Sequence, residues 1–233
     1  NIEIIYTMKK KEKLYSNTIL LEAFTIPRVY KGNCYVFSLG PRVGKTGYSK
    51  HRLYKARPGD KCAKWKKDSF DFKSCTKFVK RVLCDNPNHV QIKYFNRLNT
   101  TNLKKYTGKR YDTDLDYGWH FIAAYLADGT DGEDFHFLRR VTFDEVVSKW
   151  AYFKKNIPLR TTKEFETLKK SPDRPKYIWV HQRGWSPGGP IIHDAKDKII
   201  LHPAEANLKY PGMHYNKLCG IFKIKTRYAS VTK

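Results

Sequence analysis

Cys34 is the residue in this sequence with the clearest potential for chemistry. It follows the turn-forming pair Gly32-Asn33 and opens an apolar run that extends to Leu39. We predict a short helix over residues 33–40 with Cys34 in its first turn, where the positive end of a helix dipole lowers the pKa of a thiol. Free cysteines are also among the most buried residues. A nucleophile and a structural thiol are therefore both open interpretations.

Two histidines on predicted strands are candidate bases for Cys34. A cysteine hydrolase needs an imidazole within hydrogen-bond reach of the thiolate, and a polar group that orients the imidazole. His120 and His136 are the candidate catalytic bases, and His181 on a third strand could orient or replace either one. Asn33 could orient a partner or simply cap the helix. Each histidine could equally be a satisfied residue of a sheet, so the sequence does not choose between the two pairs.

The five cysteines show no metal-binding pattern. They form no Cys-x-x-Cys pair and are widely spaced, so we expect no zinc site and no other metal or cofactor. The odd count leaves at least one thiol free or paired between chains. We do not expect the disulfide framework of a secreted protein, and any pairing among four of them stays open: Cys62, Cys75, Cys84 and Cys219. Cys75 has helical spacing with its apolar neighbours and is expected in the core.

Apolar spacing and turn residues place the first half of the fold. Residues 69–84 have the spacing of an amphipathic helix, and residues 89–95 alternate as a strand. Residues 118–126 form a buried apolar run. A turn over 128–132 then leads to a further strand over 134–138, which predicts a hairpin.

Two possible capping boxes mark helices in the second half. Thr142 to Glu145 predicts a helix that extends to Lys155, and Thr161 to Glu164 predicts a shorter helix to Lys170. Strands are expected at the end of the chain, over 177–180, 199–201 and 219–224, with a turn over 187–190. Helices followed by a mostly antiparallel sheet define the α+β class.

The bulk composition is that of one folded domain. The chain has 233 residues, of which 40% are hydrophobic and 15% aromatic, so it can bury a sizeable core. We predict an N-terminal arm over 1–31 and a single α+β domain over 32–233, with a helical insertion at about 141–176. No run reaches the roughly 18 apolar residues of a membrane span, and Glu22 interrupts the only candidate leader segment.

The net charge of +24 predicts anionic partners. Nucleic acid, an anionic surface, or an assembly that neutralises the charge would each satisfy it. The lysines are dispersed along the chain, whereas a nucleic-acid-binding arm usually concentrates them in one block. The dispersion therefore argues against a simple basic tail.

A series of short motifs runs in order along the chain: Asn33-Cys-Tyr-x-Phe-x-Leu39, Pro58-Gly-Asp60, Gly118-Trp-His-x-Ile-Ala123, Asp131-Gly-x-Asp-Phe-His-Phe-x-Arg139, Trp179-x-His181, Pro203-x-x-Ala206 and Cys219-Gly-x-Phe-x-Ile224. This series resembles a group of bacterial and viral domains similar to the papain-like cysteine hydrolases of the NlpC and CHAP type. The resemblance implies a papain-like scaffold with the nucleophile at Cys34 and the base at His120 or His136. The chain departs from the group by its lysine content and by about 30 extra residues at 141–176.

As a whole, the chain also resembles the polyhedrins of nudiviruses, which are occlusion-body proteins of insect viruses. Its size, its 16 tyrosines, its 46 lysines and arginines and the predicted arm are similar to theirs. The resemblance implies a crystalline lattice around virions, inside the nucleus or cytoplasm of an infected cell. Tyrosine ionises near pH 10 and lysine near pH 10.4, so such a lattice would loosen in alkali.

The sequence thus predicts a self-assembling viral matrix protein on a papain-like α+β scaffold, with Cys34 as a relic or structural thiol. The first alternative is a Cys-His hydrolase that acts on peptide or amide bonds. The second alternative is a basic nucleic-acid-binding protein, for which the chain carries no recognised binding module.

Overall fold

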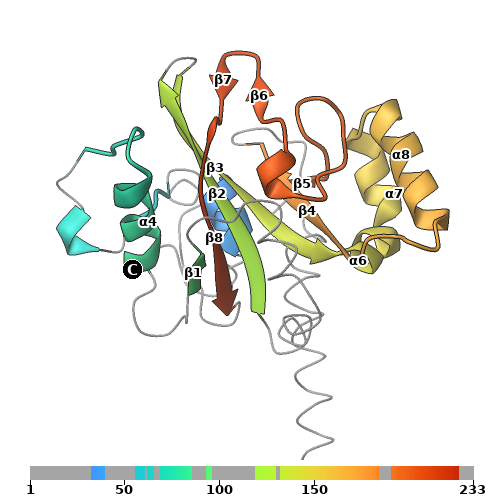
Figure 1. Cartoon of the computed structure of the whole chain (residues 1–233), viewed down its shortest axis with the longest axis horizontal. Helices are drawn as coiled ribbons and strands as arrows, with labels where there is room; N and C mark the ends of the chain where they lie inside the picture. Colours follow the sequence, from blue (N-terminus) through green and yellow to red (C-terminus); the bar gives the residue numbers. More distant parts are fainter. Residues whose placement is uncertain are drawn as a thin grey trace, which may run out of the picture.

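The computed structural model of the chain describes residues 33–39, 56–60, 62–65, 69–85, 93–95, 119–129, 132–183 and 190–225. The predicted arm over 1–31 lies outside these ranges, as do the first residues of the strand predicted at 89–95 and most of the turn predicted at 187–190. Within them the fold is α+β, as the sequence predicts, and helices pack around a central antiparallel sheet (Figure 1).

Among the described residues, six strands form the main sheet in the order β1-β8-β2-β3-β4-β5, and every neighbouring pair is antiparallel. A separate two-stranded ribbon pairs β6 with β7. The strands of the main sheet are β1 (Lys93–Phe95), β2 (Trp119–Gly129), β3 (Gly132–Thr142), β4 (Tyr177–Gln182), β5 (Pro190–Ile191) and β8 (Lys217–Lys225), and those of the ribbon are β6 (Lys209–Tyr210) and β7 (Met213–His214).

The predicted hairpin forms the centre of the sheet. β2 and β3 pair from Ile122↔Arg139 to Gly129↔Gly132. Gly129 and Gly132 end the paired strands with positive φ values of 99° and 108°. Glycine adopts this backbone conformation without a steric penalty, which explains its presence at both positions. The strand predicted over 199–201 does not form, because Ile199 makes only an isolated bridge with His193.

Among the described residues, the helices α2 (Cys34–Leu39) and α4 (Cys75–Cys84) both pack against one face of the sheet, which we call the helix face. α2 is buried along its whole length, and α4 buries Phe78, Val79 and Val82. The predicted helix over 69–84 therefore starts six residues late. The Oδ1 of Asp71 accepts a hydrogen bond from the backbone of Lys73 at 2.9 Å, and the side chain of Ser74 caps α4, so residues 69–74 form turns instead.

The predicted helical segment between β3 and β4 is present but differs in detail. Its elements are α6 (Phe143–Ser148), α7 (Trp150–Phe153), the 3-10 turn η3 (Lys154–Asn156) and α8 (Leu159–Lys170). Thr142 caps α6 as predicted, but the helix breaks at Lys149 instead of running to Lys155. The break lets Trp150 stack on Phe165 of α8, with ring centroids 3.9 Å apart.

The second predicted capping box does not cap a helix. α8 begins at Leu159, two residues before Thr161, and its N-cap is Pro158. The hydroxyl of Thr161 donates instead to the backbone oxygen of Asp197 at 2.7 Å. This bond joins the helical segment to the loop before Ile199.

The opposite face of the sheet is covered by irregular chain from 192–216. Its core includes Phe121, Ala123, Tyr125, Leu138 and Trp179. Asp194 organises the covering chain, because its carboxylate accepts backbone hydrogen bonds from three residues: Lys196, Lys198 and Asn207. We call this side the coil face.

Candidate functional site

Cys34 lies where the sequence places it, at the first position of α2. The side chain of Asn33 accepts a hydrogen bond from the backbone of Val36 at 3.1 Å, so Asn33 is the helix cap. The thiol is only 3% exposed. Its Sγ donates to the backbone oxygen of Phe135 on β3 at 3.6 Å. The residue with a nucleophile's position is therefore enclosed in the core.

The surroundings of Cys34 favour the neutral thiol. Burial raises its pKa well above the ordinary value, and the negative charge of Asp134 raises it further. Backbone hydrogen bonds lower the pKa by less. An activated cysteine needs the opposite balance, with a depressed pKa next to a cationic group. α2 has only six residues, so its dipole does not offset the burial.

His120 lies on the helix face but at the far end of α2. Side chains alternate along β2, and Ile122 and Ala124 share the core cluster of Cys34. The Nε2 of His120 donates to the backbone oxygen of Ser38 at 2.8 Å. Ser38 is four residues after Cys34, which is about 6 Å along a helix axis. Burial and the charge of Arg139 hold the pKa of His120 well below its usual value.

His136 lies on the coil face. Its neighbours Phe135 and Phe137 share the core cluster of Cys34, so the alternation of β3 directs His136 to the other side of the sheet. Its cross-strand partner, Tyr125, belongs to the coil-face core. Cys34 makes no hydrogen bond to a histidine among the described residues. The structure thus does not bring Cys34 together with either candidate base.

His136 instead pairs with His181, the third histidine singled out in the sequence. His181 Nε2 donates to the backbone oxygen of His193 at 2.9 Å, so its Nδ1 is free to accept. His136 Nε2 donates to that Nδ1 at 2.8 Å. Burial lowers the pKa of His181 to about 4, and that of His136 lies well below its usual value. Both rings are therefore neutral near neutral pH.

Two further residues, Asp134 and Tyr215, adjoin His136 on the coil face. The Tyr215 ring stacks on His136, with ring centroids 4.8 Å apart, and its hydroxyl donates to Asp134 at 2.9 Å. Burial raises the pKa of both groups. Asp134 lies two residues before His136 on the same strand face, a spacing that could have been noticed. Tyr215 follows no pattern in the sequence.

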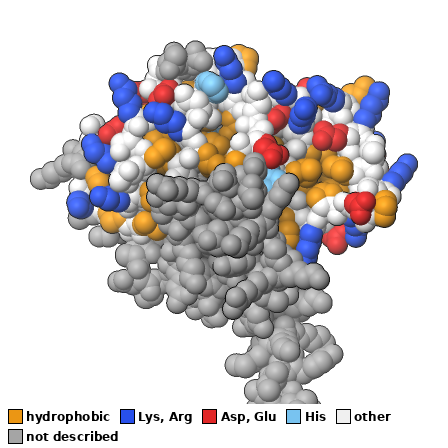
Figure 2. Space-filling model, viewed as in Figure 1, with side chains coloured by type: hydrophobic (Ala, Val, Ile, Leu, Met, Phe, Trp, Pro, Cys, Tyr) orange, Lys and Arg blue, Asp and Glu red, His pale blue; other side chains and the backbone are white. Residues whose placement is uncertain are grey.

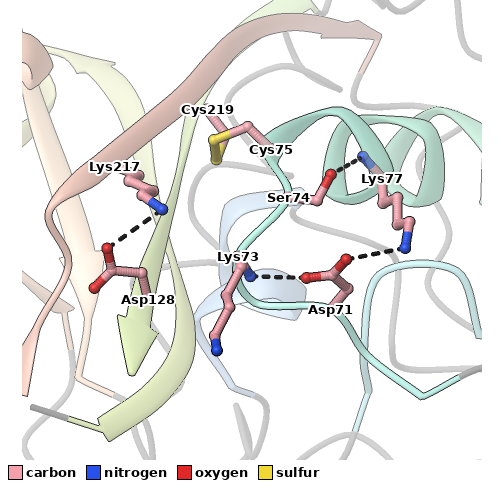
Figure 3. Close-up of a disulfide and its surroundings, with 8 residues drawn as sticks. All are labelled: Asp71, Lys73, Ser74, Cys75, Lys77, Asp128, Lys217 and Cys219. Atoms are coloured by element: carbon pink, nitrogen blue, oxygen red, sulfur yellow. Dashed lines mark hydrogen bonds and ion pairs between the residues drawn. A yellow bond between two sulfur atoms is a disulfide. The ribbon is translucent and has the colours of Figure 1, made fainter. Parts of the chain in front are cut away.

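Four of the five cysteines form disulfides, a pairing that the sequence left open. Cys62 pairs with Cys84, and Cys75 pairs with Cys219. Cys34 is the free thiol that the odd count required. Cys75 is thus a disulfide partner as well as part of the core, and it ties the start of α4 to β8 (Figure 3). The pairing could not be predicted from the sequence, because the separation of two cysteines along the chain does not determine their distance in the fold.

No group of residues with metal-binding geometry, and no helix long and apolar enough for a membrane span, occurs in the part of the chain that the structure describes. Comparison with models of known protein families, with curated proteins and with solved structures finds no match. The geometry of the chain itself therefore carries the functional argument.

Proposed function

We propose that the chain is a structural matrix protein that assembles with copies of itself, in the manner of the occlusion-body proteins that it resembles. In this proposal the scaffold is papain-like, the matrix encloses virions inside the infected host cell, in its nucleus or cytoplasm, and Cys34 has a structural role. The enclosed, neutral state of Cys34 is the observation that carries it. Cys34 has the position of a nucleophile, but its thiol is buried and makes no hydrogen bond to a basic side chain among the described residues. This arrangement fits a structural scaffold better than an enzyme.

The buried tyrosines support the part of the proposal that concerns alkali. The hydroxyl of Tyr35 donates to Asp85 and that of Tyr125 to the backbone of Pro203, both at 2.6 Å. Burial raises the pKa of both well above the ordinary value. It also raises the pKa of Tyr210 to about 12. In the unfolded chain these groups ionise near pH 10. The fold therefore loses stability as the pH rises above that value.

Sedimentation velocity tests the assembly directly. Full-length protein is measured over a range of concentrations near neutral pH and again in alkali near pH 11, above the ordinary pKa of tyrosine. We expect large assemblies near neutrality that dissociate reversibly or unfold in alkali. A protein that stays monomeric at high concentration near neutrality contradicts the proposal. The variant Cys34→Ala should assemble like the wild type, since the proposal gives the thiol no chemical role.

The Cys-His hydrolase is the second candidate, and the placement of Cys34 as the first residue of a capped helix favours it. Alkylation by iodoacetamide at mildly acid pH separates the two candidates, because only a thiolate reacts rapidly. Our proposal expects Cys34 in the native protein to react more slowly than a free cysteine, and to react normally in denaturant. Faster alkylation than free cysteine, lost in Cys34→Ser, would favour the hydrolase.

A further inference from the structure

A pocket of about 700 Å³ lies beside the start of α4, and neither Cys34 nor a histidine is among its lining residues. Three partly exposed aromatic side chains and three cationic ones contribute to its lining: Trp65, Phe70, Phe72, Lys73, Lys77 and Arg81. Its volume is within the range of sites for small molecules. A combination of open aromatic rings and cations around one cavity is not explained by the proposed matrix function.

Arg81 holds the aromatic wall of the pocket in place. Its guanidinium carbon lies 4.7 Å from the ring centre of Trp65 and 5.0 Å from that of Phe70. Its Nη2 donates to the backbone oxygen of Ser69 at 3.1 Å. Such cation–π contacts fix ring orientation. Phe70 also packs on Phe72, with ring centroids 4.6 Å apart.

The two disulfides fix both ends of the helix that carries the pocket. Cys62–Cys84 ties the 3-10 turn η1 (Ala63–Trp65) to the end of α4, and Cys75–Cys219 ties the start of α4 to β8. Figure 1 shows η1 and α4 together at one side of the sheet. A pocket whose walls are cross-linked in this way loses little conformational entropy when a ligand binds.

We propose that this pocket binds single-stranded nucleic acid, with a base stacked on Trp65 or Phe72 and the adjoining phosphates beside Lys73 and Lys77. The Lys73 side chain has no hydrogen bond or ion pair among the described residues, and it extends away from Asp71 (Figure 3). Lys77 is paired with Asp71 at 3.0 Å on the exposed surface. Such a surface pair is weak, so it can be exchanged for a phosphate contact.

Charge complementarity favours this occupant. The described residues between 62 and 81 include five lysines or arginines and one aspartate, interleaved in the sequence with the pocket's aromatic residues. Figure 2 shows basic side chains beside hydrophobic ones on this side of the molecule. Base–aromatic stacking next to cations is how single strands are held without sequence preference. Asp71 and Glu133 also line the pocket and repel a bare polyanion, so stacking of a base must contribute to binding.

Two probes of equal charge test the proposal on the full-length protein. One is a fluorescein-labelled oligothymidylate of about ten nucleotides, which is within the usual site size, and the other is its abasic counterpart of the same length. We expect the oligothymidylate to bind more tightly. Trp65→Ala should weaken its binding about 5- to 100-fold and leave the binding of the abasic strand nearly unchanged. Equal binding of both strands to the wild type would overturn the proposal, because charge alone would explain it.

Charge variants provide a second, independent readout. Lys73→Gln should reduce the slope of log affinity against log salt by about 0.7, the value for one phosphate contact on a single strand. Lys163→Gln, exposed on α8 and remote from the pocket, should leave the slope unchanged. Equal effects of the two substitutions, or equal displacement of the oligonucleotide by polyglutamate, would contradict the assignment of the site. Thermal unfolding of each variant shows whether it folds, and Phe72→Ala is the second stacking variant if Trp65→Ala does not.

Discussion

Cys34 and His136, one of the two possible catalytic pairs, lie on opposite faces of the sheet. The helix face holds a large apolar cluster in which Cys34 is enclosed together with Tyr35 and Phe137. The coil face carries a hydrogen-bonded chain of polar rings, in which His136 and His181 are both neutral. Since side chains alternate along β3, one strand supplies the backbone acceptor for the thiol and, at the next residue, a histidine that faces away from it.

This difference shows that a cysteine at the start of a helix and a histidine on a neighbouring strand need not face each other. A residue's position along the strand determines its face, and a shift of one residue would move His136 to the side of Cys34. The helix face carries the larger apolar cluster, whereas the coil face combines a smaller apolar core with the hydrogen-bonded histidine pair. The two faces should therefore respond differently to substitution and to pH.

Neighbouring residues on β3 provide the sharpest test of packing on the two faces. Phe137 is fully buried on the helix face, and its ring lies 4.8 Å from Tyr35 and 5.6 Å from Phe78. Phe137→Ala should lower the free energy of unfolding by about 3–5 kcal/mol, because it leaves a large cavity. Leu138→Ala on the coil face should cost less, since a smaller side chain is lost.

Denaturant titration of the purified variants measures both effects. Leu159→Ala is the control, because that side chain is 70% exposed and its removal should change stability by less than about 0.5 kcal/mol. A larger loss for Leu138→Ala than for Phe137→Ala would contradict the assignment of the main apolar core to the helix face.

The disulfide between α4 and β8 should also contribute strongly to the free energy of unfolding, since it links a helix of the helix face to the sheet. Cys75 and Cys219 are 144 residues apart in the sequence, whereas Cys62 and Cys84 are separated by 22. Replacement of a pair by serine should cost about 2–4 kcal/mol, and chain entropy makes the longer loop the more costly to lose, by about 1–2 kcal/mol. Denaturant titration of the two double-serine variants compares them.

A count of thiols in denatured, unreduced protein complements this comparison. One free thiol is expected, that of Cys34. Five thiols would contradict both disulfides. A chain with two disulfides is also more typical of an oxidising compartment than of the cytosol, so thiol counts on protein taken directly from its source would bear on the proposed localisation.

The pH dependence of stability distinguishes the coil face. In the folded protein the pKa of His181 is lowered to about 4, while its unfolded value is near 6.5. The unfolded chain therefore takes up the proton first, and the contribution of His181 is complete above pH 6.5 and lost as the pH falls towards 4. At about 1.4 kcal/mol per pKa unit, this loss is at most about 3.5 kcal/mol.

Denaturant titrations between neutral pH and about pH 4 test this with His181→Gln, which should show a shallower decline than the wild type. His214→Gln is the control, because that ring lies outside the histidine pair, and its decline should match the wild type. The carboxyls of Asp134 and Glu145 have raised pKa values and act in the opposite sense. The difference between variant and wild type is therefore the quantity to compare, and equal declines for His181→Gln and the wild type would contradict the neutral pair.

Local patterns predicted much of this fold. The strand at 118–126 and the hairpin to 134–138 follow from an apolar run and turn residues, and the cap was one of two roles that the sequence left open for Asn33. The start of α4 and the bond of Thr161 depended on competing hydrogen bonds, and the break at Lys149 accompanies the stacking of Trp150 on Phe165, and the sequence ranks neither effect. The faces of His120 and His136, and both disulfides, depended on how distant segments meet, which local periodicity does not record.

The smallest expected effect concerns Tyr125, which joins the coil face to the chain that covers it. Its hydroxyl donates to the backbone oxygen of Pro203 at 2.6 Å, so Tyr125→Phe should cost about 1 kcal/mol near neutrality. In alkali the order changes. Burial raises the pKa of Tyr125 in the folded protein, so near pH 10 this tyrosine ionises in the unfolded chain but not in the folded one. This ionisation stabilises the unfolded state of the wild type, whereas phenylalanine has no group that ionises. The deficit of the variant should therefore shrink above pH 10, measured by denaturant titration at neutral and alkaline pH. A deficit that is constant with pH would show that the alkali response of the fold arises elsewhere.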